Sequence, residues 1–143
     1  MAYHYEWLLP KRVIFCYVSG TQSMDEARES FGELTSRLDA GEAPTHYVAD
    51  LRHLDKLPTT NVREIQELVS FVNHPNLGWI VVIGRSNPTM TFVLTIVAKL
   101  TGVRYRAVDT LQEAIAFLSN IDSSLNLDVD LEAFYARFMQ PSR

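Results

Sequence analysis

The residues best suited to chemistry gather in one stretch, THYVADLRHLDKLPTTNVRE, which spans residues 45–64. Its candidate residues are two aspartates, two adjacent threonines and an asparagine: Asp50, Asp55, Thr59, Thr60 and Asn61. Two neighbouring carboxylates can share acid–base chemistry. An acid at the end of a strand more often pairs with a nearby base, here Arg52 or Lys56. We treat these residues as a candidate regulatory loop and predict no catalytic residue in it.

The two threonines allow a structural and a regulatory interpretation. Thr is a favoured N-cap, so Thr59 or Thr60 would start a helix after the turn at Pro58. A hydroxyl at a helix N-terminus is also a favourable place for a phosphate, whose charge suits the helix dipole and the free amides. We expect one of the threonines to be chiefly a cap, with Thr60 the better phosphorylation site.

The remaining sequence lacks the signatures of common enzymes and metal proteins. It contains no GxSxG elbow, no Walker loop, and no GxGxxG after the first strand. The four histidines do not show a HExxH or paired-ligand spacing, and Cys16 has no cysteine companion. We therefore predict no enzyme, no metal site and no cofactor.

Composition narrows the class of protein further. A length of 143 residues suits one domain, and a net charge of −4 with dispersed bases argues against a nucleic-acid partner. The single Cys16 indicates a reducing cytoplasm. The most apolar segment, residues 90–100, is too short to span a bilayer and carries Lys99, so we expect no stable membrane anchoring.

Hydrophobic periodicity predicts alternating strands and helices. We expect strands over 3–8, 12–20, 46–51, 78–84 and 103–108, and helices over 23–41, 60–73, 88–100, 111–118 and 131–139. Such alternation with short loops is typical of an α/β fold, here a mixed, mostly parallel sheet of about five strands with about four helices plus a C-terminal helix. We assign residues 1–120 to the α/β domain. Residues 121–143 form a polar connection and an amphipathic helix that is not a separate domain.

The predicted helix over 88–100 is more apolar than a helix on one face of a sheet requires. Its candidate interface residues are Phe92, Ile96 and Leu100. Either the C-terminal helix covers them, or they form a homodimer contact, a partner surface or a groove for an apolar ligand. The covering residues would be Leu131, Phe134 and Phe138.

The loop before that helix is a candidate anion site. Arg85, Ser86 and Asn87 place a base and two capping residues at a helix start, where free amides favour negative charge. Asn87 as N-cap with Pro88 at the first helical position explains the same residues without a ligand.

The order of elements and the pattern Leu54-x-x-Leu57-Pro58-Thr59-Thr60-Asn61 resemble a STAS domain, the fold of bacterial anti-sigma-factor antagonists. In that family this loop carries an acid, two hydroxyl residues and a glycine, and a partner kinase phosphorylates the second hydroxyl. By position, Pro58 stands at the acid, Thr59 and Thr60 at the hydroxyls, and Asn61 at the glycine. The closer likeness is to stand-alone bacterial STAS-like proteins of unknown function.

The resemblance implies a non-enzymatic, cytoplasmic signalling or protein-interaction module with an unidentified protein partner. The STAS fold is also similar to lipid-carrying CRAL-TRIO domains. The alternative is therefore a small binding protein for an apolar ligand such as a lipid.

Overall fold

The computed structural model describes residues 3–56, 59, 61–84, 88–127 and 130–138. In this part of the chain, five strands form one sheet in sequence order: β1 (Tyr3–Leu9), β2 (Val13–Thr21), β3 (Thr45–Lys56), β4 (Leu77–Ile83) and β5 (Tyr105–Val108). Strand β1 runs antiparallel to β2, and the remaining neighbours are parallel. The mixed, mostly parallel sheet predicted from the sequence is confirmed.

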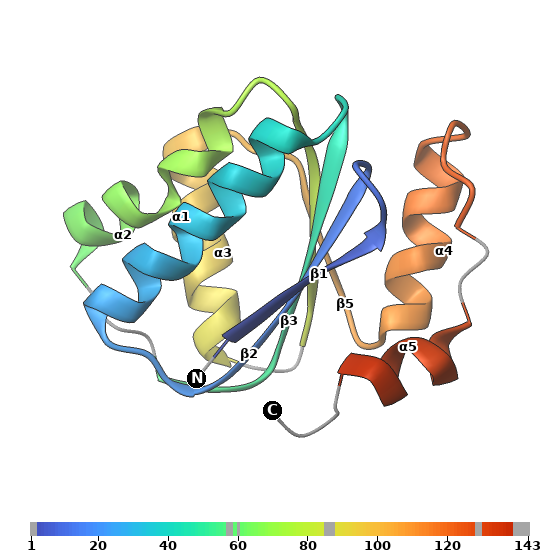
Figure 1. Ribbon diagram of the computed structural model, residues 1–143. Coiled ribbons are helices and arrows are strands. Elements are labelled where there is room, and N and C mark those ends of the chain that lie inside the picture. Colours follow the sequence, from blue (N-terminus) through green and yellow to red (C-terminus); the bar gives the residue numbers. More distant parts are fainter. Residues whose placement is uncertain (1–2, 57–58, 60, 85–87, 128–129, 139–143) are drawn as a thin grey trace.

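The helices lie in two layers. They are α1 (Met24–Ala40), α2 (Val62–Leu68) with the 3₁₀ helix η1 (Val69–Asn73), α3 (Pro88–Thr101), α4 (Leu111–Ile121) and α5 (Leu131–Phe138). The first three cover one face of the sheet, and α4 and α5 lie against the other (Figure 1). Each crossover between parallel strands moves one place in the same direction, and right-handed crossovers of that kind bring their helices to the same face.

The central strands are buried on both faces because their side chains alternate between the two helical layers. In β4, Ile80 and Val82 belong to the core beneath α1, α2 and α3, whereas Val81 and Ile83 belong to the core beneath α4 and α5. The continuous apolar run WIVVIG predicts this double burial. The two edges are β1 and the short strand β5, as expected.

The start and end of α1 follow directly from the sequence. The Ser23 hydroxyl accepts a hydrogen bond from the Glu26 amide at 3.1 Å, and the Glu26 carboxylate accepts one from the Ser23 amide at 3.0 Å. This reciprocal pair is a capping box, which a serine followed three residues later by a glutamate indicates. At the other end, the Gly41 amide donates to the Leu38 carbonyl and closes the helix.

The prediction that β3 ends near residue 51 is wrong. The strand continues to Lys56 because β2 is also long enough to pair with it, through Ser19, Gly20 and Thr21. Pairing with β4 stops at Asp50. The extra half of β3 therefore has a neighbour on one side only, and most of its side chains become exposed.

Two other predicted boundaries also differ from the structure. The helix expected over 60–73 begins at Val62 and changes to 3₁₀ geometry at Val69. The last strand begins at Tyr105 rather than Val103. The arginines of this edge do not simply face solvent: Arg104 lies over the Trp79 ring at 5.8 Å. Arg106 lies over the Phe117 ring at 5.3 Å.

Of the alternatives considered for α3, cover by the C-terminal helix is wrong. Phe134 is buried against Phe15 on the opposite face of the sheet, with the ring centroids 5.2 Å apart, and Leu131 packs into the same core. Helix α3 follows β4 on the other face, so α5 cannot reach it (Figure 1). The side chain of Phe138 lies outside the described residues.

Residues 121–143 are proposed to unfold together with the sheet rather than as an independent unit. Phe134→Ala empties a space beside the fully buried Phe15, so it should lower the free energy of unfolding by about 3 kcal/mol. Urea denaturation followed by far-UV circular dichroism should give one transition at lower urea. Ala136→Ser, at an exposed position of α5, is the control. A wild type that unfolds in two steps, with only one sensitive to Phe134→Ala, would contradict the assignment.

Candidate functional site

The first candidate residue, Asp50, is completely buried in β3 and neutralised by a base two residues away. The guanidinium of Arg52 binds both carboxylate oxygens of Asp50: Nε donates to Oδ1 at 3.0 Å and Nη2 donates to Oδ2 at 2.7 Å. The backbone amide of Arg52 adds a third hydrogen bond at 3.2 Å. A bidentate pair of this kind is a strong contact that fixes the relative orientation of the two side chains. The predicted acid–base pairing of Asp50 with Arg52 is thus present in the structure.

Asp55 does not form a carboxylate pair with Asp50. Both residues lie in β3, and five residues of extended chain span about 16 Å at ~3.3 Å per residue. Asp55 is also exposed, whereas Asp50 is inaccessible. Two carboxylates so far apart and so differently solvated cannot share a proton.

Asn61 caps the helix after this strand. The expectation that Thr59 would be the N-cap is therefore wrong. The Asn61 side-chain oxygen accepts a hydrogen bond from the Glu64 amide at 3.1 Å. Thr59 supports the cap from outside the helix. Its hydroxyl accepts from the Asn61 amide at 3.0 Å and donates to the Glu64 carboxylate at 2.7 Å.

This geometry makes Thr59 a poor site for a phosphate. Its hydroxyl already donates to the Glu64 carboxylate, so a phosphate there would face a negative charge. Thr60 lies outside the described residues, and its phosphorylation stays a prediction. The candidate anion site, Arg85, Ser86 and Asn87, also lies outside them.

The three candidate interface residues on α3 have different environments. Phe92 is exposed, whereas Ile96 is half-buried and packs against the core under α1, α2 and α3. The side chain of Leu100 lies outside the described part of the chain. Of the two described side chains, Phe92 is therefore the one available to a partner as the helix stands.

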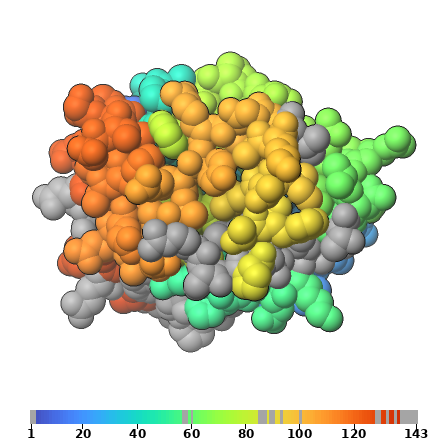
Figure 2. Space-filling model, turned by 180° about the vertical axis from the view of Figure 1, so that it is seen from behind, coloured from blue at the N-terminus to red at the C-terminus, as the bar shows by residue number. Residues whose placement is uncertain are grey.

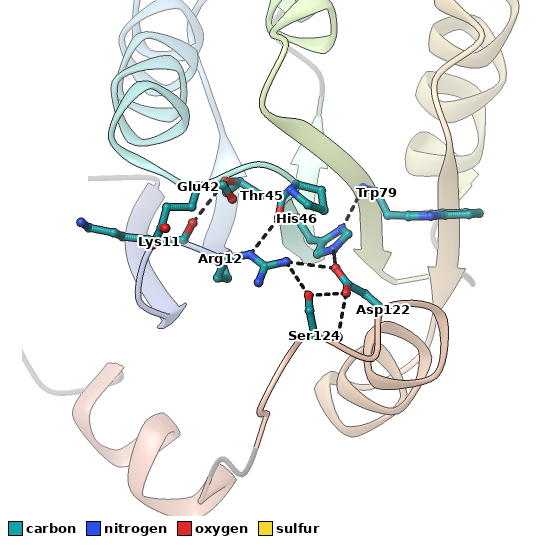
Figure 3. A network of polar contacts seen from close by, with 9 residues as sticks. Lys11, Arg12, Glu42, Thr45, His46, Trp79, Asp122 and Ser124 are labelled. Atoms are coloured by element: carbon teal, nitrogen blue, oxygen red, sulfur yellow. Dashed lines mark hydrogen bonds and ion pairs between the residues drawn. The ribbon is translucent and has the colours of Figure 1, made fainter.

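A polar network at the opposite end of the sheet was not predicted from the sequence. It joins Arg12 before β2, His46 in β3, and Asp122 and Ser124 after α4 (Figure 3). The Asp122 carboxylate accepts from Arg12 Nη2 at 3.1 Å and from His46 Nε2 at 2.8 Å. Residues from widely separated segments meet here, and no short motif in the sequence predicts the contact.

The ring of His46 is locked as one neutral tautomer. Its Nδ1 accepts the Trp79 backbone amide at 3.0 Å, so the proton resides on Nε2 and is donated to Asp122. Both nitrogens are used, and the imidazole has no lone pair left for a general base. The ring also lies directly on Gly78, where an added Cβ would stand 2.6 Å from Nδ1.

The charges of this pair follow from its surroundings. Burial, which disfavours the imidazolium, lowers the pKa of His46 below the usual 6.5 despite the nearby Asp122 carboxylate. The hydrogen bond from His46, together with those from Ser124, lowers the pKa of Asp122 from 3.8 to about 2. The network is thus a neutral imidazole bound to a carboxylate, and its chemistry is structural.

Two kinds of site were sought among the described residues: metal-binding groups and membrane-spanning helices. Among them, no group of three or more His, Cys, Asp or Glu side chains is arranged to hold a metal ion. Across the same residues, no helix has the length and apolar character needed to cross a membrane.

Comparison with known proteins identifies the fold. The sequence matches no protein-family profile and no curated protein. An uncharacterized protein of the DUF3478 family with a SpoIIAA-like fold, from Shewanella loihica PV-4, is 14% identical with a TM-score of 0.60, over 82% of this chain and 92% of that one. The anti-sigma factor antagonist SpoIIAA in its unphosphorylated form is 12% identical with a TM-score of 0.56, over 87% of this chain and 100% of that one. At these identities the likeness establishes the fold alone, and that fold is STAS-like, as the sequence resemblance implies.

The cap assignment predicts a specific order of stabilities. Asn61→Ala removes the side chain that accepts the Glu64 amide and should lower the free energy of unfolding by about 1 kcal/mol. Asn61→Asp keeps an equally good cap and should stay near the wild type. Thermal denaturation of the variants measures the order. An Asn61→Ala protein as stable as the wild type would show that the helix is capped elsewhere.

The His46 network predicts a loss of stability in mild acid. The folded pKa of His46 is depressed, so its contribution is complete above pH 6.5 and declines as the pH falls below that value. Asp122 adds a second decline between about pH 3.8 and about pH 2. Urea unfolding at pH 7.5 and 5.5 should show the first decline, and His46→Gln should reduce it.

The matched control is His4→Gln. His4 is exposed and lies outside the network, so this variant removes a histidine and leaves the buried contacts of His46 in place. Should His46→Gln fail to fold, Asp122→Asn serves instead: it removes the carboxylate that accepts the His46 hydrogen bond and opposes the depression of the His46 pKa, so it should make the first decline larger. Equal pH dependence in the His46→Gln protein and the wild type would refute the role of His46.

Proposed function

We propose that this protein is a non-enzymatic signalling or interaction module of the cytoplasm that binds a partner protein at the carboxyl end of the sheet. One observation carries the proposal. Val62 is 49% exposed and Phe92 is 46% exposed, the highest values among large hydrophobic residues in the described part of the chain. Val62 opens α2, Phe92 lies in the second turn of α3, and the two helices contact each other.

Exposed charged residues lie in the neighbouring segments at this end of the sheet. Arg52, Asp55 and Lys56 at the end of β3 are exposed, as is Arg63 at the start of α2. Figure 2 shows the start of α3 in yellow beside the end of β3 in teal to green. Aromatic and arginine side chains within a polar rim are the usual composition of a protein interface. We call Val62, Phe92 and these four charged residues the carboxyl-end surface.

The chemistry of the described residues supports a binding role over a catalytic one. Asp50 is held by Arg52, and His46 uses both ring nitrogens in hydrogen bonds. Burial raises the pKa of the Cys16 thiol to about 12, so it is a poor nucleophile. An unpaired, buried thiol also suits the reducing cytoplasm. SpoIIAA, which shares the fold, is an anti-sigma factor antagonist, so one protein of this fold acts on another protein.

A lipid carrier, the alternative expected from the sequence, is less well supported by size. The apolar cavity under α1, α2 and α3 has a volume of about 140 Å³. A cavity of ~150 Å³ holds benzene, which is far smaller than a long acyl chain. A whole lipid would need a substantial opening of this face.

The proposal is tested by changing the two exposed apolar residues. Phe92→Glu should weaken binding of a partner captured from the native host by at least about tenfold, because a central aromatic anchor typically carries such a share of the affinity. Val62→Lys should have a smaller effect. The affinity is measured with the purified partner, and circular dichroism checks that each variant is folded.

Ile121→Glu provides the matched control. Ile121 is 38% exposed at the end of α4, on the other face of the sheet. This variant should bind as the wild type does. Equal loss with Ile121→Glu and Phe92→Glu would contradict the carboxyl-end surface. A wild type that forms a dimer in light scattering, and a monomer after Phe92→Glu, would show that a second copy of this chain occupies the surface.

A further inference from the structure

An apolar cleft lies between the sheet and the layer of α1, α2 and α3, and its lining residues Leu51, Leu54 and Thr59 lie at the same end of the sheet as the carboxyl-end surface. Its volume is about 140 Å³. The sheet contributes Val18, Tyr47, Ala49 and Val82, and the helical layer contributes Phe71 and Leu94 among others. Its described lining contains no charged side chain. The cleft is therefore an apolar environment between the sheet and the helices.

Small side chains and an irregular helix explain why the space is not filled. Ala27 on α1 and Ala49 on β3 line the cleft and carry only a methyl group each. Above them, α2 ends after seven residues and the chain continues as η1. The change to 3₁₀ geometry redirects the side chains at that point, so this segment does not form one regular helical ridge against the sheet.

One polar side chain in the lining has an unused donor. Gln22 is only 8% exposed, and its Nε2 has no hydrogen-bond partner among the described residues. Other polar groups of the lining are satisfied: the Ser30 hydroxyl bonds to the Tyr5 hydroxyl at 3.1 Å, and the Thr59 hydroxyl donates to Glu64. A buried amide without a partner costs stability, so its position in an apolar cleft favours a ligand that accepts its hydrogen bond.

We propose that the cleft binds a small, neutral, mostly apolar molecule with one acceptor oxygen, and that this oxygen receives a hydrogen bond from Gln22 Nε2. The volume suits a single aromatic ring or a short aliphatic chain, since a cavity of ~150 Å³ holds benzene. The acceptor is a carbonyl or hydroxyl rather than a carboxylate, because an ionised group in this uncharged lining would be left unpaired. Aromatic ketones, aldehydes and short esters belong to this class.

The experiment compares two probes of nearly the same shape. Acetophenone carries the carbonyl, and ethylbenzene lacks it. In the wild type, acetophenone should bind more tightly, shift the side-chain amide resonances of Gln22 in an NMR titration, and show contacts to the methyl groups of Val82 and Leu94. Ethylbenzene should contact the same methyl groups and leave the Gln22 amide resonances in place.

Two variants distinguish the contribution of the hydrogen bond to binding from that of the shape of the cleft. Gln22→Leu removes the donor and should weaken acetophenone about three- to tenfold, the range of one neutral hydrogen bond, without weakening ethylbenzene. Gln66→Leu makes the same change at an exposed position of α2 outside the lining, and should leave both affinities unchanged. Thermal shifts at saturating probe give an independent measure of binding.

The outcomes distinguish this site from the other proposals. Equal affinity of the two probes for the wild type, an unchanged acetophenone affinity in Gln22→Leu, or no binding of either probe would overturn it. Stoichiometric release of a long-chain lipid on extraction of the native protein would overturn it too. Phe92 does not line the cleft, so Phe92→Glu should retain acetophenone binding even where partner binding is lost.

Discussion

The handedness of the chain crossovers is the constraint on which the rest of this fold depends. The strands succeed one another across the sheet in sequence order, so every parallel crossover steps the same way and brings its helix to the same face. The opposite face can be covered only by the part of the chain beyond the last strand, namely α4 and α5. One rule of chirality thus divides the molecule into a crowded layer of crossover helices and a layer built from the C-terminal part of the chain.

The two ends of the sheet differ as a result. At the end where the parallel strands begin, the segment leaving α4 passes close to β2 and β3, and Asp122 binds Arg12 and His46 there. At the end where they finish, β3 extends beyond β4, and α2 and α3 begin beside it with Val62 and Phe92 exposed. The first end is closed by hydrogen bonds, and the second presents side chains to solvent.

The sequence predicts features determined by neighbouring residues. The capping box of Ser23 and Glu26, the double burial of WIVVIG and the edge position of the last strand are all local, and the structure contains them. Prediction from the sequence fails where contacts between distant segments determine the structure. The length of β3 depends on β2, the face chosen by α5 depends on the path of the whole chain, and the partner of His46 lies 76 residues away. The Gln22 Nε2 atom, which has no partner in the described part of the chain, gives no signal in the sequence, since glutamine before a helix is ordinary.

The contact between His46 and Gly78 also bears on how this protein can change through evolution. The ring occupies the space that any side chain at position 78 would need, with only 2.6 Å between Nδ1 and an added Cβ. No residue other than glycine fits there while histidine stays at 46, so substitutions at the two positions are coupled. A lineage that replaces Gly78 has to replace His46 first or at the same time, and Asp122 then keeps Arg12 but loses its hydrogen bond from His46. Among divergent descendants of this chain, positions 46 and 78 should therefore vary together.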